Sequence, residues 1–215
     1  MHSKTLLMVT RLVIAGAFAL VTMPAPLRAR AATEVYQVDA ARSRVTISVG
    51  KAGAFSFIAG HTHEVSGPIE SGTVDLDPED PSRSQIRIGI AAAALKVTGA
   101  KEPPEDRPKV QEAMESDRVL DVARHPRITF ESTGVTTKRR DAATLEVVVA
   151  GRLTIRDTTQ PVTVPVRVEL AARELTASGR FAIKQTAFGI KPISVGGVVA
   201  VKDALDIAFS ITARR

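Results

Sequence analysis

The chain has 215 residues, a formal charge of +6, 44% hydrophobic and 4% aromatic residues, and no cysteine. The lack of cysteine excludes disulfides, thiol catalysis and thiolate metal sites. Residues 1–31 hold four basic residues and no acidic one, so the rest of the chain has 25 basic and 23 acidic residues and a charge of +2. A charge this small, with Lys138-Arg139-Arg140 as its only basic run, predicts no nucleic-acid partner.

Residues 1–31 have the pattern of a signal peptide. Lys4 and Arg11 flank the start of an uncharged run over residues 12–22, which is too short to span a bilayer. Ala29-Arg30-Ala31 then has the small-x-small pattern that signal peptidases cut. We therefore expect a signal peptide over residues 1–31 and a mature chain from Ala32, with an uncleaved N-terminal anchor as the alternative.

The mature chain, residues 32–215, has a length that suits one domain with a full core. Its dominant signal is alternation of apolar and polar residues, which places one set of side chains on each face of a strand. The alternation covers residues 45–49, 86–90, 145–155, 162–170 and 205–211. About eight such strands fit in the mature length, and strands with one apolar face are typical of antiparallel sheets.

One segment departs from this pattern. Residues 101–122 contain Pro108, which suits a first helical turn, and Val110, Ala113 and Met114 at helical spacing. We expect one short helix there, lying across an end or a side of the domain. Turn residues at Asp77-Pro78-Glu79-Asp80-Pro81, at Thr133-Gly134 and from Ser194 to Gly197 are expected to connect strands.

An all-β domain with this many strands can form a barrel or a two-sheet sandwich, and the alternation does not separate them. An eight-stranded barrel has an interior that side chains just fill or that holds one small ligand. The inward set here is mostly Val, Ile, Leu and Ala, so an unfilled interior is one reading. A packed core without a cavity is the other.

Four segments, in this order, resemble the YceI-like family. They are Tyr36-x-Val38-Asp39 with Ser43-x-Val45, the block from Ser116 to Thr133, the block from Gly151 to Val166, and Phe188-Gly189-Ile190. The resemblance implies an extended antiparallel, eight-stranded lipocalin-like β-barrel with one short helix over residues 32–215. It also implies a periplasmic protein that holds a lipid such as a polyisoprenoid in an apolar pocket, and it implies no catalytic residues.

A lipid site requires a concave apolar surface, because each buried CH2 of a chain contributes about 0.8 kcal/mol. The largest apolar side chains near strand positions are our candidates for the pocket lining. Ordinary core packing is the alternative reading for each of them. They are Phe55, Phe57, Ile58, Phe130, Phe181 and Phe188.

A second candidate site is Gly60-His61-Thr62-His63-Glu64. On a strand, His61 and His63 would share a face and could ligate zinc or copper if a third ligand joined them. His125 is the other mature histidine, and no third ligand is evident, so we favour no metal and treat the pair as polar or titrating residues. A metal-dependent, stress-related protein that uses His61 and His63 remains the alternative function.

Motifs of nucleophilic, nucleotide-binding and zinc enzymes are not found in the sequence. We therefore expect a carrier that is not an enzyme, that needs no cofactor, and that has a long-chain lipid or isoprenoid as its partner. A partner-binding module with a solid core is a further alternative. Transient contact with a membrane and formation of a homodimer stay open.

Overall fold

The computed structural model describes residues 33–52, 63–98, 104–195 and 199–215. Strands make up most of this part of the chain, as the alternation predicts. The strands are β1 (Glu34–Val38), β2 (Arg44–Ala52), β3 (His63–Pro68), β4 (Ser71–Leu76), β5 (Gln85–Ala91), β6 (Lys96–Val97), β7 (Arg127–Arg140), β8 (Thr144–Ile155), β9 (Thr158–Leu170), β10 (Glu174–Lys184), β11 (Ser194–Val195) and β12 (Val199–Arg214). The helices are α1 (Arg107–Glu115) and the 3-10 turns η1 (Pro81–Arg83), η2 (Ala92–Ala94) and η3 (Gln185–Phe188).

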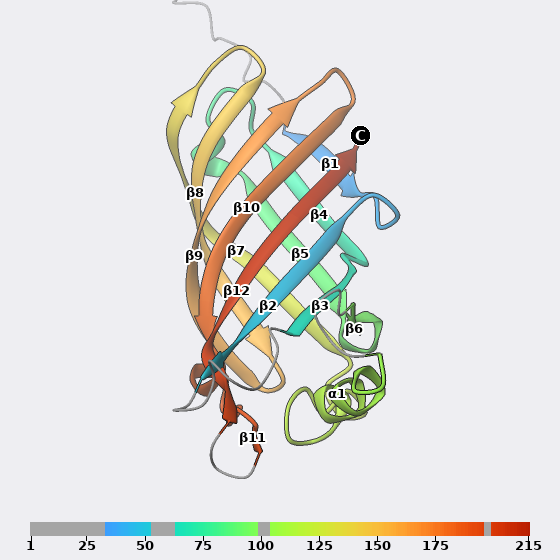
Figure 1. The fold of residues 1–215 in the computed structure, drawn as a ribbon. Coiled ribbons are helices and arrows are strands. Elements are labelled where there is room, and N and C mark those ends of the chain that lie inside the picture. Colours follow the sequence, from blue (N-terminus) through green and yellow to red (C-terminus); the bar gives the residue numbers. More distant parts are fainter. Residues whose placement is uncertain (1–32, 53–62, 99–103, 196–198) are drawn as a thin grey trace, which may run out of the picture. The chain divides into compact units, whose positions relative to one another are not determined.

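The strands form one antiparallel sheet that closes on itself (Figure 1). The last strand, β12, pairs with β10 on one edge from Ala204 to Arg214. On its other edge it pairs first with β2 and then, through Val38↔Ala213 and Gln37↔Arg214, with β1. This closure makes an eight-stranded barrel, so the prediction of an eight-stranded all-β barrel is confirmed and the sandwich is excluded.

The first three strands of the barrel are each broken into two pieces. Because β1 pairs with β4 while β2 pairs with β3, β1 and β2 lie end to end, and so do β4 and β3. In the same way β5 pairs with β4 and β6 pairs with β3. The sequence alternation did not reveal these breaks, because each piece keeps the period of two on its own.

Ser43 supports the barrel wall at the break between β1 and β2. Its hydroxyl donates to the Thr212 carbonyl oxygen at 3.2 Å and accepts from the Thr212 amide at 3.0 Å, and the Ser43 side chain is buried. The Asp39 carboxylate accepts the Ala41 amide at 3.1 Å, which folds the connecting turn. The Thr212 carbonyl also accepts the Asp39 amide at 2.8 Å, so what the Ser43 side chain adds at the break is the acceptor for the Thr212 amide.

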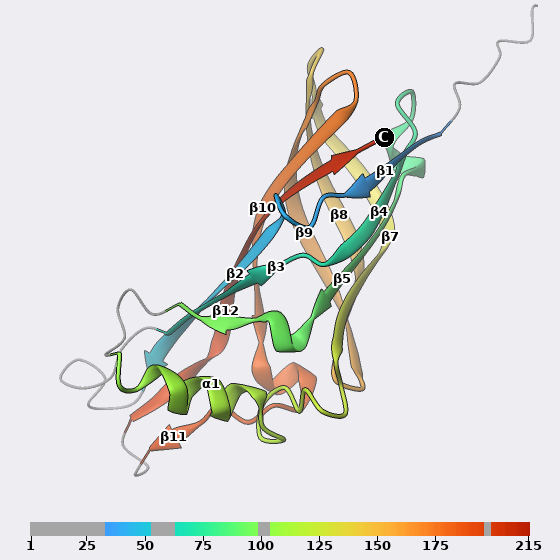
Figure 2. The same cartoon turned by 90° about the vertical axis from the view of Figure 1, so that its right-hand side faces the viewer.

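The predicted short helix is confirmed as α1, with Pro108 in its first turn. It lies at the end of the barrel where β6 and β11 are also found (Figures 1 and 2). None of its residues is fully buried, so polar bonds to β6 carry much of its attachment. The side-chain oxygen of Gln111 accepts a hydrogen bond from the Val97 backbone amide at 2.8 Å, and its side-chain nitrogen donates to the Leu95 carbonyl at 3.0 Å. Lys96 also forms an ion pair with Glu115 at 3.2 Å.

One predicted turn is wrong. Thr133-Gly134 lies inside β7, which continues to Arg140 and shows a register shift against β8 between Ser132 and Gly134. A glycine in a strand is common at such bulges. The turn from Asp77 to Pro81 is confirmed: the Asp77 carboxylate accepts the amides of Glu79 and Asp80 just before η1. Among the described residues, no helix is long and apolar enough to cross a membrane.

Candidate functional site

The barrel encloses a cavity of about 1040 Å³. Protein interiors contain few voids larger than a water molecule, so a space of this size is not a packing defect. It lies at the upper end of the range for small-molecule pockets. The reading of a packed core without a cavity is therefore wrong.

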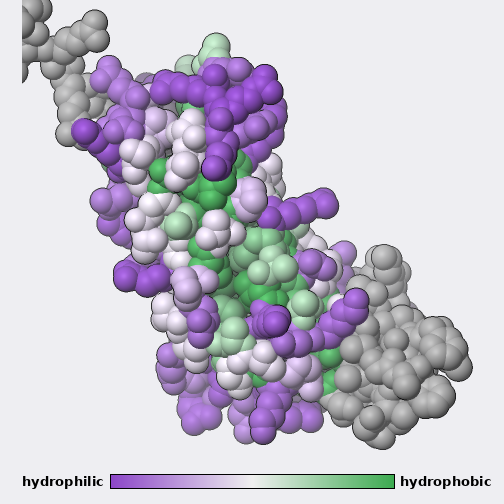
Figure 3. Space-filling model, turned by 90° about the vertical axis from the view of Figure 1, so that its left-hand side faces the viewer, coloured by the Kyte–Doolittle hydropathy of each residue, from purple (hydrophilic) through white to green (hydrophobic). Residues whose placement is uncertain are grey.

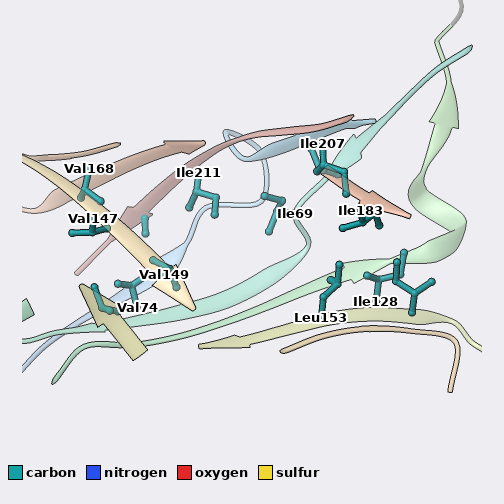
Figure 4. Close-up of a cluster of buried hydrophobic side chains, with 14 of the residues drawn as sticks. Ile69, Val74, Ile128, Val147, Val149, Leu153, Val168, Ile183, Ile207 and Ile211 are labelled. Atoms are coloured by element: carbon teal, nitrogen blue, oxygen red, sulfur yellow. The ribbon is translucent and has the colours of Figure 1, made fainter. Parts of the chain in front are cut away.

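The inward faces of the strands line this cavity. All the Val, Ile, Leu and Phe residues of the alternating segments 45–49, 86–90 and 205–211 are among its lining residues, as are Leu145, Val147, Val149, Leu153 and Ile155 of β8. In Figure 4, side chains from strands on opposite sides of the barrel point toward the shared interior. The ten that it labels all line the cavity: Ile69, Val74, Ile128, Val147, Val149, Leu153, Val168, Ile183, Ile207 and Ile211.

Apart from the buried Ser84 directly after η1, the polar lining residues gather at the end of the barrel that carries α1. They are His63 at the start of β3, Asp106 and Lys109 at the start of α1, Arg118 after α1, and Gln185 in η3. The Lys109 side chain is 78% exposed and Arg118 is also exposed, so the cavity meets the surface at this end. We call these five residues the polar rim.

At the opposite end the cavity is bordered by apolar side chains that are almost fully buried. Leu145 of β8 and Leu175 of β10 both line it and are 4% and 2% exposed, respectively. Pro81 of η1 also lines it and is buried. The one polar lining residue here among those described is Ser84, whose hydroxyl accepts the Asp77 amide at 3.1 Å. The cavity therefore has one largely apolar, buried end and one polar, exposed end, which is the polarity of an amphiphile.

Hydrogen bonds fix the position of Gln185 in the rim. Its side-chain amide donates to the Lys202 carbonyl at 2.8 Å. The next residue, Thr186, donates its amide and its hydroxyl to the Asp203 carboxylate at 2.9 and 2.8 Å. These two bonds lower the pKa of Asp203, because hydrogen bonds to a carboxylate favour its ionised form. The link between η3 and β12 is thus charge-assisted at neutral pH.

A left-handed glycine positions the apolar residues of the same turn. Gly189 has φ 71° and ends η3, and its amide bonds back to Thr186. The chain reverses there, so that Phe188 and Ile190 on either side of the glycine are both buried. Ile190 lines the cavity. The Phe188-Gly189-Ile190 motif is therefore a structural turn that closes part of the rim.

The structure separates the six apolar candidates. Phe130 of β7 and Phe181 of β10 line the cavity, as their strand positions suggested. Phe188 is 2% exposed and belongs to the buried core cluster, but it is not among the lining residues. Phe55, Phe57 and Ile58 lie outside the described residues.

The two histidines cannot be judged as a pair, because His61 lies outside the described residues. His63 lines the cavity as part of the polar rim. In the described part of the chain, no group of three His, Asp, Glu or Cys side chains could hold a metal ion. His125 lies elsewhere, with its Nδ1 at 3.2 Å from the Asp157 carboxylate.

Sequence reasoning did not find most of the rim. Lys109 and Arg118 appear in the sequence as ordinary surface charges, and Gln185 carries no signal of its own. The apolar stripe of α1 was a usable signal, since Val110, Ala113 and Met114 all line the cavity. The helix therefore completes the cavity wall beside its mouth.

Known proteins with this architecture support the assignment of the fold. A model of the YceI-like domain family matches residues 36–213. No curated protein matches the chain.

Three solved structures are similar to this barrel, at identities that show the fold alone. The structure of BcnA from Burkholderia cenocepacia has a TM-score of 0.59 and 23% identity, with 81% of this chain and 98% of that chain covered. A polyisoprenoid-binding domain from Saccharophagus degradans, implicated in plant cell wall breakdown, has a TM-score of 0.55 and 12% identity, with 83% and 97% covered. The YceI protein from Campylobacter jejuni has a TM-score of 0.50 and 14% identity, with 66% and 78% covered. With the family model matched over nearly all of the described barrel, the chain belongs to the YceI-like family.

Proposed function

We propose that this protein binds a long apolar lipid, of the polyisoprenoid kind, inside its barrel and carries it in the periplasm. The observation that carries the proposal is the cavity of about 1040 Å³, apolar along its length and polar at one exposed end. In this proposal the protein is exported through residues 1–31, catalyses no reaction and needs no cofactor.

The energetics of such a site come from burial. Each CH2 moved from water into the cavity contributes about 0.8 kcal/mol, so about ten of them contribute about 8 kcal/mol before the cost of ordering the ligand. A net binding free energy of about 8 kcal/mol corresponds to a Kd of about 1 µM, so a chain of more than ten CH2 groups is needed to offset the ordering cost as well. Tight binding therefore needs no specific polar contact along the chain of the ligand.

The polar rim suits the head of the same ligand. His63, Lys109 and Gln185 place hydrogen-bonding groups around the exposed end of an otherwise apolar cavity. An amphiphile oriented with its head at the rim would keep its polar group in contact with water and with these side chains. The apolar tail would then extend toward Leu145 and Leu175.

The relatives support the same class of ligand. The similar domain from Saccharophagus degradans is described as polyisoprenoid-binding. At 12% identity this likeness does not transfer the ligand, and the choice of a polyisoprenoid here remains our proposal.

The direct test is native mass spectrometry of the mature protein purified from a bacterial periplasm, followed by solvent extraction of what it carries. We expect a stoichiometric adduct with the mass of a long-chain, isoprenoid-like lipid. Folded protein that neither carries such a lipid nor takes one up on incubation would contradict the proposal. Stoichiometric metal that disappears in a His61→Ala/His63→Ala variant would instead favour the metal-binding alternative.

Two alanines of β10 offer a matched pair of variants. Ala177 lines the cavity, whereas Ala182 is exposed on the outer face of the same strand. Ala177→Phe places a ring in the space of the ligand, and we expect it to weaken binding of the extracted lipid by about tenfold or more, the effect of about two displaced CH2 groups. Ala182→Phe should leave the affinity unchanged. Equal affinities for the two variants would argue against the cavity as the site.

A further inference from the structure

Two long neighbouring strands of the barrel wall, β9 and β10, are paired over only part of their length. The first half of β9 and the second half of β10 are not paired with each other, and we call this boundary the seam. β9 pairs with β8 over its whole length, and β10 pairs with β12 over its whole length. Between β9 and β10, however, pairing runs only from Leu175↔Leu170 to Gly179↔Val166. The stretch from Arg180 to Lys184 has no partner on β9 within the part of the chain that the structure describes.

Proline explains where the pairing stops. Continued in register, the next position would place Arg180 opposite Pro165. The Pro165 carbonyl oxygen lies 2.5 Å from where a Cβ on Gly179 would be, so the backbone groups of Pro165 face β10. Proline has no N–H, so it cannot return a hydrogen bond to β10 at this point.

A second proline repeats the effect. Pro161 lies four residues before Pro165, so its backbone faces the same side and also lacks a donor there. On the other edge of β9, Pro165 and Pro161 stand opposite Val148 and Arg152 without interrupting the ladder to β8. The prolines therefore weaken the β9–β10 seam selectively.

Cavity-lining residues lie on both sides of this seam. Val164 and Val166 of β9 and Phe181 and Ile183 of β10 all line the cavity. Val166 and Phe181 are only partly buried. Figure 3, which faces the side of the barrel that is at the left in Figure 1, shows a strip of hydrophobic residues at the surface between hydrophilic ones.

The lower end of the seam is held by one side-chain bond. The Gln160 side-chain amide donates to the Ala187 carbonyl of η3 at 2.8 Å. Between this bond and the Gly179↔Val166 pair, no residues of β9 and β10 are paired in the part of the chain that the structure describes. Segments with few backbone hydrogen bonds open at low free energy, so this is where the wall separates most readily.

We infer that the seam between residues 159–165 of β9 and residues 180–184 of β10 is a lateral portal through which the apolar chain of the ligand enters and leaves the cavity. This inference rests on the proposed function. A lateral route lets a long chain pass sideways between apolar residues. Threading through the polar rim would instead carry every CH2 past charged groups.

The test is to cross-link the seam and to measure exchange of cis-parinaric acid, a fatty acid whose fluorescence rises in an apolar environment. The chain has no cysteine, so Thr163→Cys/Ala182→Cys provides a unique pair across the seam for a short bis-maleimide. The matched control is Ala182→Cys/Asp206→Cys, which joins residues that already face each other on β10 and β12. Mass spectrometry and circular dichroism establish that the link has formed and that the protein is folded.

We expect the cross-linked seam to slow association and dissociation of the probe equally, by about tenfold or more, which corresponds to about 1.4 kcal/mol of added barrier. The Kd should stay unchanged, because the bound and free states are the same. The control link should change neither rate. Unchanged rates in the cross-linked seam variant would overturn the portal, whereas absence of probe binding to the unmodified protein would count against the proposed function itself.

A second variant serves if the cross-link distorts the barrel. Pro161→Val/Pro165→Val restores two N–H donors toward β10 and should extend the ladder past Gly179. We expect slower amide hydrogen exchange from Arg180 to Lys184, together with slower uptake and release of the probe. Slower amide exchange with unchanged probe kinetics would likewise overturn the portal.

Discussion

Gly151 provides a sharp test of how the cavity wall is packed. Its missing side chain would point inward from β8, and a Cβ at this position would lie 2.4 Å from two ring carbons of Phe130 and 2.7 Å from the Glu131 carbonyl oxygen. Ordinary contacts to a Cβ are 3.4 Å or longer, so the Phe130 ring would have to move by about 1 Å. The Glu131 carbonyl belongs to the β7–β8 ladder and is harder to displace.

We expect Gly151→Ala to lower the free energy of unfolding by about 1 to 3 kcal/mol, the usual cost of overpacking. For a domain of this size that corresponds to a fall in Tm of about 2 to 12 °C. Urea and thermal unfolding, followed by far-ultraviolet circular dichroism, measure both quantities. Because Phe130 lines the cavity, the displaced ring should also lower the affinity for an apolar probe.

The matched control is Gly134→Ala on the neighbouring strand. A Cβ on Gly134 would meet nothing within 4 Å, so this variant should be neutral or slightly stabilising. A double variant, Gly151→Ala/Phe130→Leu, should be more stable than the sum of its single changes predicts, since the smaller side chain relieves the main clash. A Gly151→Ala protein as stable as the wild type would refute this account of the packing.

Two further predictions concern stability. Ser43→Ala should lower the free energy of unfolding by about 1 to 3 kcal/mol, because it leaves a buried amide of β12 without its acceptor, while Ser178→Ala on the exposed face of β10 should have little effect in the same urea titration. The pKa of Glu174 is lowered because its carboxylate accepts hydrogen bonds from two guanidinium groups. The larger effect comes from Arg42 in the β1–β2 turn, and the second from Arg214 at the end of β12. The contribution of Glu174 is therefore present above the unfolded pKa of about 4.3 and is lost as the pH falls through the lower folded value. The difference in urea midpoint between wild type and Glu174→Gln at pH 7 should close in acid, and a difference that persists at low pH would contradict the assignment.

Much of the fold was accessible from the sequence because its main signal is local. Alternation with a period of two tells which face of each strand is apolar, and the segments 45–49, 86–90 and 205–211 do line the interior. The same reasoning located α1 from Pro108 and the spacing of Val110, Ala113 and Met114. These features depend on neighbouring residues only.

Other features were not accessible, because they depend on contacts between distant segments. The structure shows that Gly151 makes room for the Phe130 ring of the neighbouring strand, a contact that no local pattern indicates. Thr133-Gly134 carried the chemistry of a turn, yet pairing with β8 keeps it inside β7. Which phenylalanines face the cavity was likewise decided by tertiary contacts: Phe130 and Phe181 line it from strands, whereas Phe188 of η3 packs in the core.

The sequence by itself thus determined the all-β class of the fold and the apolar character of the interior, since both follow from local alternation. Closure of the barrel through β1 and β12, the volume left unfilled inside it, the polar rim and the unpaired seam were decided only by the tertiary structure. The physical reason is that a cavity is the difference between the space that the closed strands enclose and the space that their side chains fill. Neither quantity exists until residues far apart in the chain are brought together.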